Sequence, residues 1–366
     1  MISIFKPGSN PETPIRNEVP SIALIVCAYN EEDYIIDKLE NSLNLLYPQA
    51  RLSIYFVIDG SDDNTYELLD GYDIPDEYNV KVLHDPVRAG KVGAMNRVME
   101  IIEEDIAVFT DANSMLNPEA IMHLIKHFQD KDVALVAGEK SISKDGKMNV
   151  ARGGEGLYWK YESHLKYLES RVGNTIGAAG EIFAIRSDLY DEIPGDSIIE
   201  DFYLSMKMAL KGKKIGYEPL AIASETGSLN IAEERKRKIR IANGAFQVIG
   251  RLKGLFRFWN TPMLTWQYFS HKILRWAAVP FLLPILLVLN GILAYFHGGI
   301  YLYLMIIQMI FYTLAFIGYL FNRKKSRSSV LFIPFYIVFM NTSIIEGFFQ
   351  FLFSKGSVNW EKARRG

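Results

Sequence analysis

Three long apolar stretches in the rear of the chain constrain its fold more than any other feature. They run from Ile273 to Phe296, from Gly299 to Phe321 and from Val330 to Phe353. The first two are long enough to cross a bilayer, for which a helix needs roughly 20 predominantly apolar residues. The third contains Asn341 and Glu346. The pattern therefore leaves open whether the third stretch spans the membrane or re-enters on one side.

The charges of the chain are divided between its front and its rear. From Arg235 to the C-terminus there are 18 Lys and Arg residues against two acidic ones, so this part carries +16. The whole chain has a formal charge of −2, so the remainder carries −18. An acidic front joined to a basic, apolar rear is typical of a soluble domain attached to a membrane. The positive-inside rule places the basic runs 235–240 and 323–327 on the cytosolic side.

The single cysteine and the composition of residues 1–20 also agree with a domain inside the cell. The one cysteine, Cys27, lies inside an apolar run, where it is expected to be a small buried hydrophobe. No disulfide can form within the chain, which fits a reducing compartment. Residues 1–20 are polar and contain four prolines without an apolar core. We therefore do not expect them to be a signal peptide.

Apolar runs of strand length alternate with helical patterns in the front of the chain. The runs are Ser21–Ala28, Leu52–Ile58, Asn79–Leu83 and Asp105–Phe109, and between the first two lies a helical pattern of apolar residues. This alternation predicts an α/β fold in which a mainly parallel sheet is flanked by helices on both faces.

Polar side chains follow three of these predicted strands. Tyr29 and Glu31 follow the first, Asp59 the second, and Asp111 and Asn113 the fourth. Taken singly, each fits a cap or a turn. Together they predict an acidic cleft at the carboxyl edge of the sheet, where open α/β sheets bind their ligands. The carboxylate and amide oxygens at 111 and 113 suit Mg²⁺ or Mn²⁺, and such a cation suits a diphosphate.

Four spaced pieces of this region resemble the family 2 glycosyltransferases, which have the nucleotide-sugar-binding GT-A fold. The pieces come in the family's order: Ala28-Tyr29-Asn30-Glu31, Asp59-Gly60-Ser61 with Asp63 and Thr65, Arg88-Ala89-Gly90-Lys91 with Asn96, and Asp111-Ala112-Asn113. Any one piece is weak evidence, but their agreement is specific. The resemblance covers roughly residues 20–245 and implies that Lys91 lies near the nucleotide.

The resemblance also implies roles for the residues that follow the strands. It assigns the nucleoside to Tyr29, Glu31 and Asp59. Asp111 and Asn113 take the family's Asp-x-Asp role on the metal. Asn113 stands where the family most often has a second Asp. Its carbonyl oxygen is still a metal ligand, so metal binding is expected to survive.

Two adjacent acids, Glu200 and Asp201, follow an apolar pair at a predicted helix start. Acidic residues in a first turn are stabilised by the helix dipole, so the pair need not be functional. The pair stands in the place of the family's Glu-Asp motif. The resemblance therefore implies that Asp201 is the general base that deprotonates the acceptor hydroxyl, with Glu200 beside it. One base opposite the leaving diphosphate gives a single displacement with inversion.

Two segments of the middle are candidates for contact with the acceptor. Tyr158–Arg171 reads as a helix with an aromatic face, which is either core or a sugar-binding wall. Gly173–Gly180 consists largely of small residues that let a ligand approach the backbone closely. Between the strand predicted at 133–138 and that helix, Ser141–Arg152 is expected to form a mobile loop.

A basic run follows the domain. Arg237-Lys238-Ile239-Arg240-Ile241 stands in the place of the family's Gln-x-x-Arg-Trp motif. Arg240 matches the motif and is able to contact a diphosphate bidentately, and Arg237 replaces the Gln beside the same nucleotide-sugar. Ile241 replaces a Trp that the family associates with a growing glycan in processive synthases. This difference favours the addition of one sugar and leaves polymerisation open.

These patterns divide the chain into five parts. They are a polar N-terminal segment (1–20), a GT-A domain (21–243), an interfacial amphipathic region (244–272), a transmembrane region of two or three spans (273–353) and a basic tail (354–366). If the third stretch spans, the tail lies outside, against the positive-inside rule. A re-entrant hairpin would keep it inside.

The expected function is that of an inverting, metal-dependent hexosyltransferase. We expect a multi-pass protein of the inner membrane with its catalytic domain in the cytoplasm. It would move a sugar from a nucleotide-sugar, a UDP-sugar by expectation, to a glycan or lipid-linked acceptor in cell-surface polysaccharide or glycolipid synthesis. The alternative is a catalytically silent partner that binds nucleotide or glycan in a synthase complex, against which the intact Asp111 and Asp201 argue. Nucleic acid is a poor ligand, because the segments beside the basic run are apolar.

Overall fold

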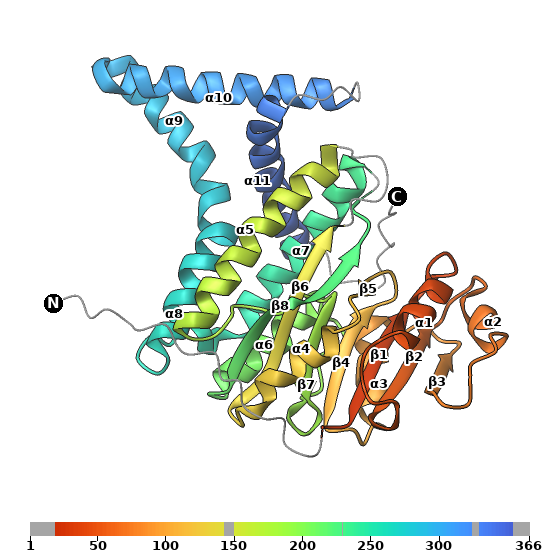
Figure 1. Cartoon of the computed structure of the whole chain (residues 1–366). Helices are drawn as coiled ribbons and strands as arrows, with labels where there is room; N and C mark the ends of the chain where they lie inside the picture. Colours follow the sequence, from red (N-terminus) through yellow and green to blue (C-terminus); the bar gives the residue numbers. More distant parts are fainter. Residues whose placement is uncertain (1–18, 143–149, 229, 324–328, 354–366) are drawn as a thin grey trace.

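The computed structural model describes residues 19–142, 150–228, 230–323 and 329–353. It has an eight-stranded sheet flanked by helices, from which three long apolar helices project on one side (Figure 1). The basic tail, all but the last two residues of the polar N-terminal segment, and most of the basic run 323–327 lie outside the described residues. So does 143–149, the larger part of the loop predicted at 141–152.

The first half of the sheet is parallel and matches the predicted strands. Strands β1 (Ile22–Ala28), β2 (Leu52–Asp59), β3 (Asn79–Asp85) and β4 (Ile106–Asp111) lie in the order β3-β2-β1-β4. Every residue of β2 is buried, because helices cover both faces of the sheet. The predicted α/β class with a mainly parallel sheet is confirmed.

The second half of the sheet mixes directions. Strands β6 (Val133–Ile142) and β8 (Lys214–Glu225) run parallel to each other, whereas β7 (Ile182–Arg186) and β5 (Met115–Leu116) run antiparallel to their neighbours. Because β7 is antiparallel to β4, β7 begins at the edge where β4 ends. This reversal brings residues 180 and 181 beside Asp111.

Helices close both faces of the sheet. They are α1 (Ile35–Leu43), α2 (Thr65–Asp70), α3 (Gly90–Met99), α4 (Ala120–Ile125), α5 (Val150–Val172), α6 (Glu200–Leu210) and α7 (Ile231–Arg251). Successive side chains of a strand point to opposite faces. Ala23 and Ile25 of β1 accordingly lie in one core with α3, α6 and α7, and Leu24 and Val26 lie in another with α1 and α4.

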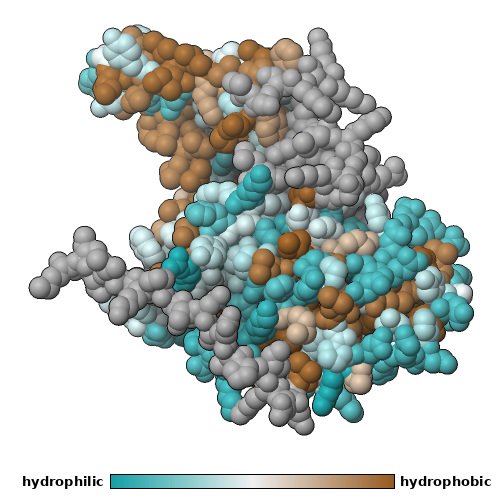
Figure 2. Space-filling view, in the orientation of Figure 1, coloured by the Kyte–Doolittle hydropathy of each residue, from teal (hydrophilic) through white to brown (hydrophobic). Residues whose placement is uncertain are grey.

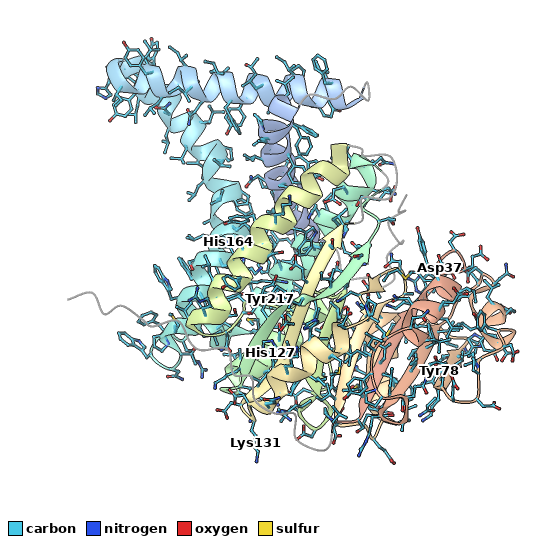
Figure 3. The ribbon with its side chains drawn as sticks, viewed as in Figure 1. Asp37, Tyr78, His127, Lys131, His164 and Tyr217 are labelled. Atoms are coloured by element: carbon cyan, nitrogen blue, oxygen red, sulfur yellow. The ribbon has the colours of Figure 1, made fainter. Side chains whose placement is uncertain are left out.

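Strand β8 and helix α5 are joined by polar contacts on one face of the sheet. Tyr217 of β8, labelled in Figure 3, donates a hydrogen bond to Glu139 at 2.5 Å. Ser163 of α5 donates to the same carboxylate at 2.5 Å, and the Lys166 ammonium lies 5.9 Å from the centre of the Tyr217 ring. These contacts hold α5 over the edge of the sheet on which the strands end.

The predicted interfacial region does not form one helix. Helix α7 runs through the predicted boundary at 243 to Arg251, and Ala245, Phe246 and Val248 are buried in the domain core. Helix α8 (Pro262–Tyr268) follows, and a π-helical segment (Phe269–Ala278) leads directly into α9 (Val279–His297). The apolar side chains of the first part of this stretch pack on the domain instead of facing a headgroup layer.

Three helices are long and apolar enough to cross a membrane. The candidate spans are Pro262–His297, Gly299–Phe321 and Leu331–Phe353, and they end in α9, α10 (Gly299–Arg323) and α11 (Ser329–Phe353). Figure 1 shows α9 leaving the domain, α10 crossing at its far end and α11 returning. Figure 2 shows hydrophobic side chains gathered over this part.

Helix α11 returns to contact α7 closely. A Cβ at Gly347 would lie 2.5 Å from the Ala242 Cβ, so the two helices approach at a residue without a side chain. Glu346, the acidic residue of the third apolar stretch, forms an ion pair with Arg235 of α7 at 2.5 Å. Glu346 therefore lies at the domain end of α11 with a cationic partner.

Candidate active site

A cavity of about 1400 Å³ lies at the carboxyl edge of the sheet and extends to α9 and α11. All ten residues singled out in the sequence contribute to its lining: Tyr29, Glu31, Asp59, Lys91, Asp111, Asn113, Glu200, Asp201, Arg237 and Arg240. These residues come from strand ends, from the first turns of α3 and α6, and from α7. The fold thus brings together positions that are up to about 200 residues apart.

The turns after β1 and β2 hold each other in place. The Asn30 backbone, at φ +53°, donates a hydrogen bond to Ser61 at 3.0 Å, and the Glu31 N–H donates to the Thr65 hydroxyl at 2.8 Å. That hydroxyl in turn donates to Asp63 at 2.6 Å. Several residues of the first two motif pieces therefore shape the backbone, so that Glu31 is presented at the cavity.

Asp59 organises the turn that precedes α3. It is 3% exposed, accepts hydrogen bonds from the N–H groups of Ala89 and Gly90 at 3.1 and 2.6 Å, and pairs with Arg97 at 2.8 Å. The turn places the Arg88 guanidinium 3.6 Å from the centre of the Tyr29 ring, a cation–π distance. The carboxylate predicted to contact the nucleoside therefore also supports the wall of its site.

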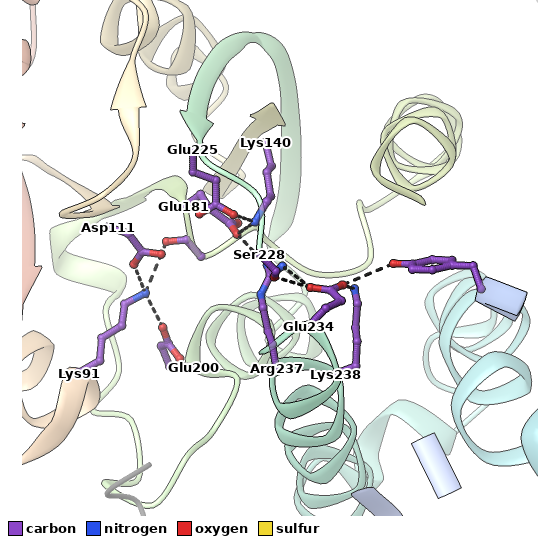
Figure 4. Close-up of polar contacts among 12 residues, drawn as sticks. Lys91, Asp111, Lys140, Glu181, Glu200, Glu225, Ser228, Glu234, Arg237 and Lys238 are labelled. Carbon is purple, nitrogen blue, oxygen red and sulfur yellow. Dashed lines mark hydrogen bonds and ion pairs between the residues drawn. The ribbon is translucent and has the colours of Figure 1, made fainter. Parts of the chain in front are cut away.

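A lysine lies between two carboxylates at the centre of the site. The Lys91 ammonium is 2.7 Å from an Asp111 oxygen and 2.8 Å from a Glu200 oxygen (Figure 4). Burial lowers the pKa of Lys91, but the two carboxylates outweigh it and hold this pKa well above its ordinary value. The ammonium thus supplies the positive charge that both carboxylates contact.

The donor groups here fit a hard divalent cation. Asp111 ends β4, and Asn113 in the following turn lines the same cavity. Among the described residues, no three His, Cys, Asp or Glu side chains gather as a metal cluster. A site with one carboxylate and one amide oxygen suits Mg²⁺ or Mn²⁺, since Mg²⁺ is usually bound by one or two carboxylates together with phosphate oxygens and water.

Asp201 faces the same space from the first turn of α6. A Cβ at Gly180 would lie 3.5 Å from the Asp201 carboxylate and 3.6 Å from the Lys91 ammonium, so one small residue flanks both groups. Burial and then the neighbouring Glu200 raise the pKa of Asp201 to about 7. A general base is most effective when its pKa lies near the working pH. Asp111 and Asp201 thus line one cavity, as the sequence-based hypothesis requires.

The two arginines of α7 differ in their surroundings. Arg237 lies 3.5 Å from Glu181 and 3.8 Å from Glu234 (Figure 4), whereas the Arg240 side chain is exposed on the cavity wall. Glu181, which was not singled out in the sequence, also pairs with the buried Lys140 at 2.5 Å. Arg237 is therefore part of a protein ion-pair network, and Arg240 faces the space in which a ligand would lie.

A buried lysine supports the turn after β4. It was not singled out in the sequence. Lys38 of α1 is fully buried and donates hydrogen bonds to the Thr110 hydroxyl, at 3.1 Å, and to the Ser114 carbonyl. Burial lowers the pKa of Lys38 to about 7. The signal in the sequence was a lysine next to Leu39 in the apolar stripe of a helix.

A second buried charge cluster joins α5 to the π-helical segment. Glu162 pairs with Lys272, with Arg275 at 2.6 Å and with His271 at 3.3 Å, and Glu169 lies 2.5 Å from His271. Burial raises the pKa of Glu162, but Lys272 and Arg275 outweigh it and hold this pKa well below its ordinary value. The partners are about 110 residues apart in the chain, so no local pattern revealed them.

Comparison with known proteins identifies a family from the sequence and a fold from the structure. The model of the family "Glycosyl transferase family 2" matches residues 23–193. The poly-beta-1,6-N-acetyl-D-glucosamine synthase of Staphylococcus aureus strain MSSA476 is 28% identical over 244 residues, which are 64% of this chain and 57% of the relative. The synthase of the same name from Staphylococcus epidermidis strain ATCC 35984 is 27% identical over 256 residues, 67% of this chain and 58% of the relative. The chain thus spans less than three-fifths of the length of these relatives.

A solved structure shares the fold over nearly the whole chain. It is a mannosyltransferase from Pyrobaculum calidifontis in complex with GDP-Man and Mn²⁺. The two superpose with a TM-score of 0.70 at 20% identity, covering 93% of this chain and 89% of that one. The likeness therefore extends beyond the sheet to most of the chain.

Proposed function

We propose that this chain, whose residues 23–193 match glycosyl transferase family 2 and which has the GT-A fold, transfers a sugar from a nucleotide-sugar to a glycan or lipid-linked acceptor at a membrane. One observation carries the proposal: Asp111, Glu200 and Asp201 meet around Lys91 on one wall of a cavity that reaches the apolar helices. The cavity supplies carboxylates for a cation that binds the diphosphate, and it supplies a base for the acceptor hydroxyl.

The chain's own groups divide the chemical work. Asp201 takes the proton from the acceptor hydroxyl, whose oxygen forms the bond to the anomeric carbon. The bond from that carbon to the diphosphate breaks, and the nucleoside diphosphate leaves as an anion, so the displacement inverts the configuration. Lys91 and Arg240, which both line the cavity, would offset part of the negative charge of the diphosphate. Asp111 and Asn113 would hold a Mg²⁺ or Mn²⁺, which would supply Lewis-acid neutralisation of the leaving diphosphate.

The donor is proposed to be a UDP-sugar. The staphylococcal relatives are synthases of an N-acetylglucosamine polymer by name, which makes N-acetylglucosamine the first sugar to test here. Ile241, in the place of the family's Trp, lines the cavity. Its shorter side chain offers no aromatic platform for a glycan, so we propose the addition of one sugar per acceptor.

The proposed location is the inner membrane, with several spans and a cytoplasmic catalytic domain. Support comes from the three apolar helices and from the basic residues of α7, which lie on the domain side of those helices. The proposed division of the chain keeps a GT-A domain followed by a transmembrane region, but the domain extends past 243 along α7, which ends at Arg251.

The test uses membranes bearing the full chain and a panel of UDP-sugars and GDP-mannose, with Mn²⁺, with Mg²⁺ or with a chelator. We expect metal-dependent release of the nucleoside diphosphate from one donor, and its loss in Asp201→Asn. If no donor is consumed although nucleotide still binds, the alternative of a silent partner in a synthase complex is favoured instead.

A further inference from the structure

The hydrogen-bond donors of the Lys91 ammonium are all taken up by oxygens of the protein. The ammonium belongs to the first turn of α3 and lies 2.7 Å from Asp111 and 2.8 Å from Glu200 (Figure 4). The Gly180 carbonyl, at 3.5 Å, is a third and longer contact. Because an ammonium has three N–H donors, Lys91 cannot contact a phosphate without leaving at least one of these partners.

Asp111 is also the carboxylate proposed to hold the divalent cation. The oxygens that bind Mg²⁺ in proteins lie about 2 Å from the ion, so a cation on Asp111 would share one carboxylate with the Lys91 ammonium. A dication and an ammonium at such a separation repel each other more strongly than two unit charges do. Lys91 and the divalent cation therefore compete for Asp111.

The charges around Lys91 make each ligand unfavourable when it binds alone. Asp111, Glu200 and Asp201 gather near this one ammonium. A divalent cation alone would leave the ammonium with Glu200 as its remaining ion-pair partner. A diphosphate alone would be repelled by the carboxylates. A cation and a diphosphate that arrive together offset each other's charge, and the diphosphate supplies a new partner for Lys91.

The Lys91 side chain is able to change partner within the cavity. It is 31% exposed, and it lines the cavity. The flexible four-carbon stem of a lysine lets its ammonium move while the helix stays in place. Two further carboxylates of the lining already have cations, since Asp59 pairs with Arg97 and Glu181 with Lys140. A diphosphate bound in the cavity would offer Lys91 a partner that is not paired within the protein.

We propose that Lys91 couples the binding of the divalent cation to the binding of the donor. Before the donor binds, the ammonium occupies the place at Asp111 that the divalent cation takes afterwards. The cation and the donor then bind together, because the diphosphate receives the ammonium that the cation displaces. This inference rests on the proposed function and goes beyond it by assigning Lys91 a role in the order of binding at the same site.

The experiment measures Mn²⁺ binding to the full chain in detergent, with and without UDP, by the electron paramagnetic resonance of the free ion. Lys91→Met removes the competing ammonium, so Mn²⁺ alone should bind about tenfold more tightly, and the gain in Mn²⁺ affinity that UDP gives should shrink about tenfold. Lys91→Arg keeps the positive charge and should bind Mn²⁺ alone as weakly as the unchanged chain. Lys214→Met removes an exposed lysine that pairs with Asp130 outside the cavity, and it should change neither quantity. The inference is overturned if Lys91→Met binds Mn²⁺ alone no more tightly than the unchanged chain does.

A measurement on the unchanged chain covers the case in which a substitution at Lys91 disturbs folding. Acetylation of lysine amines, followed by mass spectrometry of the peptide that contains Lys91, reports whether this ammonium is paired. Acetylation of Lys91 should increase when Mn²⁺ alone fills the site and should fall again when UDP is added. No increase would contradict displacement by the cation. Binding of Mn²⁺ and UDP that does not depend on Lys91 overturns this inference alone, whereas failure of the unchanged chain to bind either ligand also refutes the proposed function.

Discussion

The cavity has a donor end, at the carboxyl edge of the sheet, and a membrane end, lined by α5 and the π-helical segment. The two ends are built in different ways. At the donor end, Asp59 and Asp111 each end a strand and Asp201 begins a helix, so regular elements fix the carboxylates at one edge of the sheet. At the membrane end, Glu162 and Arg275 come from helices far apart in the chain and meet as buried ion pairs. The sheet thus positions the reacting groups, while the ion pairs join α5 to the π-helical segment that leads into α9.

The largest effect is expected at the donor end, from Asp201→Asn. The amide cannot accept the proton of the acceptor hydroxyl, so the transfer rate should fall about 10³-fold with little change in donor binding. Single-turnover transfer and nucleotide titration measure the two quantities. Asp196→Asn, in a surface pair with Arg251, is the matched control and should retain full rate. A rate loss below about tenfold would remove Asp201 from the chemistry.

The largest effect on stability is expected at the membrane end. Glu162→Gln leaves the buried Lys272 and the partly exposed Arg275 without their carboxylate, which should lower the free energy of unfolding by about 3 kcal/mol. Thermal unfolding in detergent, followed by tryptophan fluorescence, measures the change. Asp132→Asn, which removes an exposed pair with Lys214 at 3.7 Å, should change stability by about 0.5 kcal/mol or less. Equal effects of the two variants would contradict a buried cluster.

Gly177 lies where the two ends meet, so a substitution there should disturb both. Its φ is +94°, and a Cβ would lie 2.3 Å from the Phe202 ring, which packs 5.3 Å from the Trp276 ring. Gly177→Ala should cost about 2 kcal/mol through backbone strain and displacement of Phe202, and it should also slow transfer, because Asp201 is adjacent. Gly195→Ala, with no atom within 4 Å of the new Cβ, should be neutral in both assays.

The smallest effect is a pH dependence at the donor end. Burial and Glu200 raise the pKa of Asp201 from 3.8 to about 7. The base is active when ionised, so kcat/KM should rise with pH and level off above about 7, with about a tenfold change per unit below it.

The stability contributed by Asp201 should change in the opposite direction. Between pH 3.8 and about 7 the folded state binds more protons at this group than the unfolded state, so its contribution to stability falls as pH rises. Asp201→Asn should therefore raise the melting temperature more at about pH 8 than at about pH 5. A profile of kcat/KM that is flat across pH 7 would contradict the shifted base.

The sequence predicted the donor end well because its residues follow apolar runs at short, fixed spacing. Asp59 and Asp111 could be read as strand ends, and both line the cavity. Strand β8 was missed, because Pro219 and Leu220 interrupt its alternation of buried and partly exposed residues. The buried ion pairs of the membrane end could not be predicted, since Glu162 meets its partners about 110 residues away only through the packing of α5 on the π-helical segment.

The lysine beneath the turn after β4 illustrates the same limit. Lys38 stands in a helical stripe with Ile35 and Leu39, where an apolar residue is expected. Its hydrogen bonds to Thr110 and to the Ser114 carbonyl depend on how α1 packs against the end of β4. A lysine in an apolar stripe indicates a buried polar contact, but only the fold identifies the partner.

The central claim is that Asp111 contributes to a cation site at the donor end that the nucleoside diphosphate completes. Its most direct test is the binding of Mn²⁺ to the full chain with UDP present, followed by the electron paramagnetic resonance of the free ion. We predict one Mn²⁺ site that Asp111→Asn abolishes or weakens by at least about tenfold and that Glu162→Gln leaves intact. Undiminished Mn²⁺ binding by Asp111→Asn would contradict the claim.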